Sequence, residues 1–170
     1  SLILGAYMLY MAGRCSSIEQ GGELIQEALH SGRGADKFRK MIHAQGGDQR
    51  AADDPSLLPL SDNVIPIKAE QAGYIYSIDA RGVGQAAHIL GAGRSTKEDP
   101  IDHSVGIVLS KRMGEMVRKG ETLAYFYVTR EDLFERAADA FKRAVVIKQE
   151  RPQPKPLVYG VVTAEGIERY

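Results

Sequence analysis

The chain has 170 residues, of which 44% are hydrophobic and 26% are charged, as in one globular domain or a small domain with a helical extension. Lysine and arginine together number 22, as do aspartate and glutamate, so the formal net charge is zero and no basic excess favours a nucleic acid partner. The single cysteine, Cys15, cannot form an internal disulfide, so we expect a protein of a reducing compartment, the cytoplasm.

The first segment, SLILGAYMLYMAG, is strongly apolar. It lacks the basic start and the cleavage site of a signal peptide, and it is shorter than the roughly 20 residues that span a bilayer. We therefore expect a core helix that is apolar on nearly every side, and no membrane partner. Because the chain begins with Ser1 and not with Met, we expect the elements that cover this helix to lie upstream.

Three helices are predicted in residues 1–46. The serines at 16–17 are followed three residues on by Glu19 and Gln20, a capping-box spacing that predicts the start of the second helix. An apolar stripe then runs to Ser-Gly-Arg-Gly, whose glycines favour a helix end. A third helix is predicted over about 35–45, before a pair of glycines.

The composition changes after residue 46. Residues 47–63 hold two prolines, a run of acids and no apolar period, which predicts a linker. The apolar period then drops to two, which is typical of strands, and Gly120 falls where a tight turn needs a positive φ. The predicted elements are strands over 64–78 with a turn at Ala72-Gly73, a helix at about 83–90, strands within 104–128, a helix at about 130–143, and closing strands at 145–148 and 157–162.

Several segments occur in an order that resembles one enzyme family. They are KFRKMIHAQGGD, DDPSLLP, AGYIYSID, GAGRSTKEDPIDHSVGIVL, GEMVRKGETLA and KPLVYGVV. The chain resembles the C-terminal part of the pyrimidine nucleoside phosphorylases, which include thymidine phosphorylase. The resemblance implies an α+β fold class. Residues 1–46 would complete an α/β domain, residues 64–170 would form a C-terminal α+β domain, and residues 47–63 would be the linker between them. Its sheet would be mainly antiparallel and barrel-sandwich-like, related to lipoyl and biotinyl domains, with packed helices.

The family's reaction is phosphorolysis, in which phosphate and a pyrimidine nucleoside give the free base and a pentose 1-phosphate. The resemblance implies that a Lys-His-Ser-x-Gly-Gly segment holds phosphate and that an Arg, a Ser and a Lys hold the base. This chain contains neither segment. We therefore expect no catalytic or substrate-binding residue and no cofactor here, and a structural chain that is inactive alone. Its partners would be the missing N-terminal part of the same enzyme, which binds nucleoside and phosphate, and a second copy in a homodimer.

The stretch GAGRSTKED has a functional and a structural interpretation. In the first, Gly91 and Gly93 expose backbone N–H groups and Arg94 and Lys97 add charge, which would make an anion-binding loop. In the second, Gly91 ends the preceding helix, Arg94 forms an ion pair with Asp102, and Asp102 or Ser104 caps the next segment. We favour the second interpretation, because the glycines come after a predicted helix and not after a strand.

The remaining candidate residues indicate no metal site. His30, His43, His88 and His103 share no ligand spacing. The two acids of Ala-Asp-Asp at 52–54 lie in the linker, where they are expected to be solvated. Tyr125, Phe126 and Tyr127 lie on a predicted strand, so they should alternate between core and surface.

Two other functions stay open. Residues 106–128 also resemble half of a biotinyl or lipoyl carrier domain, although the lysine of Ser-Lys-Arg lacks the methionines that usually flank a carrier lysine. A stand-alone interaction module is the other, with the apolar first helix as its contact surface.

Overall fold

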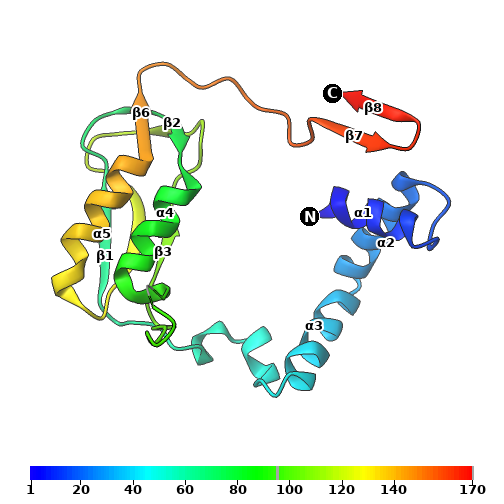
Figure 1. The fold of residues 1–170 in the computed structure, drawn as a ribbon, viewed down its shortest axis with the longest axis horizontal. Helices are drawn as coiled ribbons and strands as arrows, with labels where there is room; N and C mark the ends of the chain where they lie inside the picture. Colours follow the sequence, from blue (N-terminus) through cyan, green and yellow to red (C-terminus); the bar gives the residue numbers. More distant parts are fainter. Residues whose placement is uncertain (95, 170) are drawn as a thin grey trace. The chain divides into compact units, whose positions relative to one another are not determined.

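The computed structural model describes residues 1–94 and 96–169. Two compact units are present, Ser1–Leu58 and Pro59–Tyr170, coloured from blue to cyan and from cyan to red in Figure 1. The first unit is helical, and the second combines helices with antiparallel sheets. This content confirms the α+β class.

The first unit contains the three predicted helices, α1 Leu2–Met11, α2 Ile18–His30 and α3 Arg33–Ala44. The capping box is confirmed, because Ser17 Oγ accepts the Gln20 N–H at 3.2 Å and Gln20 Oε1 accepts the Ser16 N–H at 2.7 Å. Helix α3 begins earlier than predicted, since Gly32 adopts a left-handed conformation with φ 78° and serves as its N-cap.

Helix α1 packs on α2 through small residues. A Cβ on Gly21 would lie 2.8 Å from the Ala6 carbonyl oxygen, so the two backbones approach closely at this point. The other faces of α1 stay open within this unit: Leu4 is 71% exposed, Met8 66% and Met11 76%. The apolar helix is confirmed, and most of its apolar surface contacts nothing in residues 1–58.

The predicted linker contains two short 3₁₀ turns, Gln49–Ala52 and Pro55–Leu57. The Asp53 carboxylate binds the Arg39 guanidinium through two hydrogen bonds of 2.8 and 2.6 Å. This pair ties the linker to α3. The first compact unit extends to Leu58, so it includes most of the predicted linker.

Six strands of the second unit form two three-stranded sheets in which every pair is antiparallel. Their orders are β1-β5-β3 and β4-β2-β6, and neither closes into a barrel. The strands are β1 Val64–Lys68, β2 Gly73–Ile78, β3 Gly106–Leu109, β4 Met116–Val117, β5 Thr122–Tyr127 and β6 Val145–Lys148.

Two helices complete the core of the second unit. They are α4 Ala80–Ala87, which continues into a π turn over His88–Ala92, and α5 Glu131–Ala144. Figure 1 shows them side by side, and buried Phe126 of β5 contacts the α5 ring of Phe141 edge to face at 5.4 Å. Phe126 is fully buried whereas Tyr125 is 41% exposed, which confirms the predicted alternation.

Two turns of one sequence type, RMGE and RKGE, connect β3, β4 and β5. In each, the glutamate carboxylate accepts the arginine N–H at 2.9 Å, and the glycine has a positive φ, 88° at Gly114 and 84° at Gly120. Each glycine N–H donates a 2.8 Å bond to a carbonyl, that of Ile75 and that of Ala69. The turn predicted at Gly120 is confirmed.

Two predicted elements need correction. The helix expected over 83–90 begins at Ala80, because the Asp79 carboxylate accepts the Arg81 N–H at 3.1 Å and caps it. The strand expected over 157–162 does not close a main sheet. It is β7 Gly160–Thr163, which pairs only with β8 Gly166–Arg169 in a hairpin of its own.

Candidate functional site

The predicted anion-binding loop comes directly after α4. Gly91 has φ 113° at the end of the π turn, which agrees with its predicted role at a helix end, whereas Gly93 is extended. Ser95 lies outside the described residues. Because the glycines come after helical and not strand backbone, the loop lacks the strand-to-helix arrangement of a phosphate-binding loop.

Asp102 fixes this loop. Its Oδ1 accepts the Ser104 N–H at 2.9 Å and the Ser104 hydroxyl at 2.6 Å, and its Oδ2 accepts the Thr129 hydroxyl at 2.7 Å. These bonds, the Ser104 hydroxyl first, lower the pKa of the Asp102 carboxyl. The predicted ion pair with Arg94 is wrong: among the described residues no ion pair joins them, because nearby hydroxyls occupy the carboxylate.

A groove of about 560 Å³ lies between this loop and the start of α5. Gly91, Gly93 and Asp102 line it, and Arg94 and Lys97 do not. Two carboxylates line it as well, those of Asp99 and Asp102, together with the guanidinium groups of Arg130 and Arg136, so its charge is mixed. The cradle of Gly91, Gly93, Arg94 and Lys97 stays a prediction.

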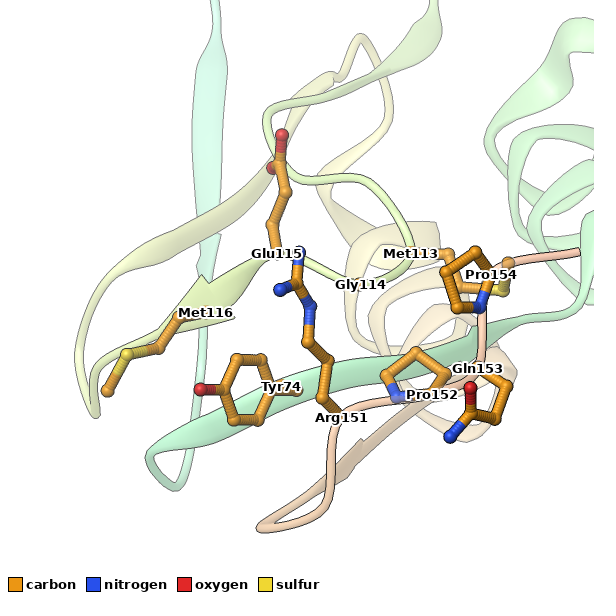
Figure 2. Close-up of a pocket in the computed structure, with 9 residues that line it drawn as sticks. All are labelled: Tyr74, Met113, Gly114, Glu115, Met116, Arg151, Pro152, Gln153 and Pro154. Carbon is orange, nitrogen blue, oxygen red and sulfur yellow. The ribbon is translucent and has the colours of Figure 1, made fainter.

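Figure 2 shows a second pocket, of about 530 Å³, on the outer face of sheet β4-β2-β6. Tyr74 and its cross-strand neighbour Met116 line it, opposite the connector that carries Arg151, whose side chain extends towards the turn of Glu115. Glu115 caps its own turn, so the pocket offers apolar walls, one cation and one carboxylate that is already engaged. It contains no nucleophile paired with a base, so it has no catalytic set of its own.

The described residues contain no group of three histidine, cysteine, aspartate or glutamate side chains placed to hold a metal ion. The acids of the linker are used structurally: Asp53 binds Arg39, and Asp54 caps a 3₁₀ turn through the Ser56 N–H at 3.1 Å. These carboxylates are therefore engaged with protein groups.

The candidate carrier lysine also has a partner. Lys111 Nζ forms an ion pair with Glu121, and the lysine side chain is 21% exposed. The same pair is the largest cause of the lowered pKa of Glu121. A lysine held in this way is not the free arm that a carrier domain requires.

Known proteins are similar to this chain over most of its length. The family model of the pyrimidine nucleoside phosphorylase C-terminal domain matches residues 74–148. A pyrimidine-nucleoside phosphorylase of Bacillus subtilis is 38% identical over 162 residues, which are 95% of this chain and 37% of the relative. This chain belongs to the pyrimidine nucleoside phosphorylase family. It corresponds to the C-terminal portion of the proteins in that family, as the sequence resemblance indicates.

Two other pyrimidine-nucleoside phosphorylases support the assignment. That of Geobacillus stearothermophilus is 43% identical over 132 residues, which are 78% of this chain and 30% of the relative. That of Staphylococcus haemolyticus is 41% identical over 132 residues, with the same coverage. The chain thus spans about a third of the length of these phosphorylases. Within the described residues, every helix is too short or too polar to cross a bilayer.

Sequence reasoning missed one concave surface, the groove between α4 and α5. It is lined by two arginines and a histidine that lie far apart in the sequence, Arg136, Arg143 and His88. The spacing of seven between the arginines places them on one face of α5 and was a usable signal. Their position opposite His88 required the packing of the helices.

Proposed function

We propose that this chain is the C-terminal portion of an enzyme that converts a pyrimidine nucleoside and phosphate into the free base and a pentose 1-phosphate. The observation that carries the proposal is the 38% identity to the Bacillus subtilis pyrimidine-nucleoside phosphorylase over 95% of this chain. Identity at this level extends through both units, so it supports a shared role for the helical residues as well as for the C-terminal domain.

The role that we propose for the chain is structural. Residues 1–46 complete an α/β domain whose remaining part is supplied by the rest of the enzyme. Residues 64–170 form the terminal domain, and residues 47–63 are the linker between the two. The exposed apolar side chains of α1, among them Leu4, Met8 and Met11, support this assignment. An apolar helix face of this kind is normally covered by another apolar surface.

We propose that the chain alone is inactive. Phosphorolysis places charge on the departing base and on the phosphate, so it needs cationic and hydrogen-bonding groups around both reactants. The Lys-His-Ser-x-Gly-Gly segment that the family resemblance assigns to phosphate is absent from this sequence. Nucleoside and phosphate would therefore bind to the other part of the enzyme, which would act as a cytoplasmic homodimer.

The terminal domain would also be related to the barrel-sandwich domains of biotinyl and lipoyl carriers. Two antiparallel three-stranded sheets and the pair of Arg-x-Gly-Glu turns support this relation. The relation concerns architecture, because Lys111 is paired with Glu121 and has no carrier role in this proposal.

The test is an assay of the purified chain with uridine or thymidine in the presence of phosphate. We expect no release of uracil or thymine above the rate without protein, whereas a full-length relative assayed in parallel releases the base. Phosphate-dependent turnover by the chain alone would refute the proposal that the chain is structural and that the reactants bind to the other part of the enzyme.

A further inference from the structure

The groove between α4 and α5 has a floor of small residues. A Cβ on Gly82 would lie 2.7 Å from the Cβ of Ala144, so the two helices approach closely at that end. Ala140 lies one turn before Ala144 on the same face of α5 and also lines the groove. The resulting hollow has a volume of about 620 Å³, which is ample for a small ligand.

Hydrogen-bond donors line both sides of this floor. Arg136 and Arg143 lie one turn on either side of Ala140 on α5. Gln85 and His88, which are three residues apart on the facing side, line the groove from the α4 segment. A group above Ala140 is therefore within reach of two guanidinium groups, an amide and an imidazole.

The two arginines are available for a ligand. In the described part of the chain, neither Arg136 nor Arg143 forms an ion pair or a side-chain hydrogen bond. Their neighbours differ: Arg130 binds Asp132 at 2.7 Å, and Lys142 binds Glu70 at 2.8 Å. The cations at 130 and 142 thus have partners, whereas the two arginines that line the groove have none among the described residues.

The His88 ring packs closely against the chain at Gly93. Any Cβ at that position would collide with the imidazole Cδ2. Glycine at 93 therefore leaves room for a half-buried imidazole that lines the groove. This packing explains why residue 93 is glycine without invoking an anion-binding loop.

One carboxylate also lines the groove, that of Asp79. Its Oδ1 accepts the Arg81 N–H at 3.1 Å, so the side chain is engaged in capping α4. The acids Glu135 and Asp139 on α5 do not line the groove, and they help to raise the pKa of Lys142 on another flank. The residues that line the groove therefore carry two guanidinium charges against one carboxylate, and Arg136 and His88 also line the neighbouring groove of Asp99 and Asp102.

We propose that this groove binds a phosphate group, seated above Ala140 between the guanidinium groups of Arg136 and Arg143 on one side and Gln85 and His88 on the other. Planar guanidinium groups bind tetrahedral phosphate through paired N–H donors, and two of them neutralise its charge. The ligand is either inorganic phosphate or a phosphate monoester, because both present the same oxygens. This inference concerns the described residues alone and does not rest on the proposed enzymatic activity.

The test is an NMR titration of the ¹⁵N-labelled chain at constant ionic strength with inorganic phosphate, uridine monophosphate or uridine. We expect saturable shifts at the amides of α4, α5 and Gly93 with both phosphates and none with uridine. Equal affinities would identify the free ion as a sufficient ligand, and tighter binding of the nucleotide would identify a monoester. Shifts with uridine alone, or no saturable shift with either phosphate, would overturn the proposal.

Variants separate this groove from general charge. The double variant R136Q and R143Q should weaken phosphate binding by at least about tenfold, because it removes both charged donors. The matched control, R112Q and R118Q, removes the same charge from exposed turns outside the groove and should bind as the wild type does. An A140E variant, which adds a carboxylate above the floor, should abolish binding. Equal losses in the control, or unchanged binding by folded R136Q/R143Q and A140E variants, would refute the assignment.

Discussion

The hydrogen bonds of Asp102 allow a quantitative prediction about the loop after α4. The substitution Asp102→Ala removes three bonds, of 2.9 and 2.6 Å from Ser104 and of 2.7 Å from Thr129. Each such bond contributes roughly 0.5–1.5 kcal/mol, and Thr129 is exposed, so we expect a loss of about 2 kcal/mol in the free energy of unfolding. Asp102→Asn should cost less than about 1 kcal/mol, since its amide oxygen can still accept from Ser104 and its NH₂ can donate to Thr129.

Urea denaturation of the whole chain, monitored by the fluorescence of its tyrosines, measures these differences. The lowered pKa of Asp102 gives the sign of the pH dependence: its contribution is complete above the ordinary carboxyl pKa of about 4 and is lost as the pH falls through the lowered value. The advantage of the wild type over Asp102→Asn should thus shrink in acid. An Asp102→Ala variant as stable as the wild type would refute the reasoning, and equal damage by Asp102→Asn would show that charge matters more than hydrogen-bond geometry.

Three further predictions concern other parts of the chain. Gly120→Ala, at φ 84° with no atom within 4 Å of the added Cβ, should lose roughly 1–2 kcal/mol of unfolding free energy in urea denaturation through backbone strain alone. Its control, Gly84→Ala inside α4 with equally open space, should gain roughly 0.5–1 kcal/mol, and a loss in both would contradict the conformational argument. Phe141→Ala removes a fully buried ring that contacts Phe126, so it should lose about 3–5 kcal/mol of unfolding free energy in the same assay. A smaller loss than that of the exposed-site variant Tyr125→Ala would show that the core lies elsewhere. Hydrogen bonds from Arg50, chiefly from its side chain, lower the pKa of Asp48 to about 2. An NMR titration of Arg50→Gln should therefore find the Asp48 pKa raised towards its ordinary value. An unchanged pKa would exclude this ion pair in solution.

Local chemistry made several elements predictable from the sequence. The serine and glutamine of the capping box lie within one turn of each other, so their spacing alone predicts the start of α2. Gly120 was predictable for a similar reason, because a turn that needs a positive φ selects glycine. The buried Phe126 between two tyrosines is a consequence of the alternation of side chains along a strand.

Contacts between distant residues were less predictable. Strands β1 and β2 are neighbours in sequence, yet β1 pairs with β5 and β2 with β4 and β6, and a period of two does not encode the partner. The Arg94–Asp102 prediction failed because Thr129, distant in sequence, and Ser104 satisfy the same carboxylate. The α4–α5 groove was missed for the same reason, since its donors come together only when the helices pack.

The central claim, that this chain is the C-terminal portion of a pyrimidine nucleoside phosphorylase, can be measured with a chimera. In the full-length Bacillus subtilis relative, the segment that matches this chain is replaced by residues 1–170, and the same relative truncated before that segment serves as the control. We predict phosphate-dependent release of uracil from uridine by the chimera and none by the truncated control. A folded chimera that releases no uracil would contradict the account.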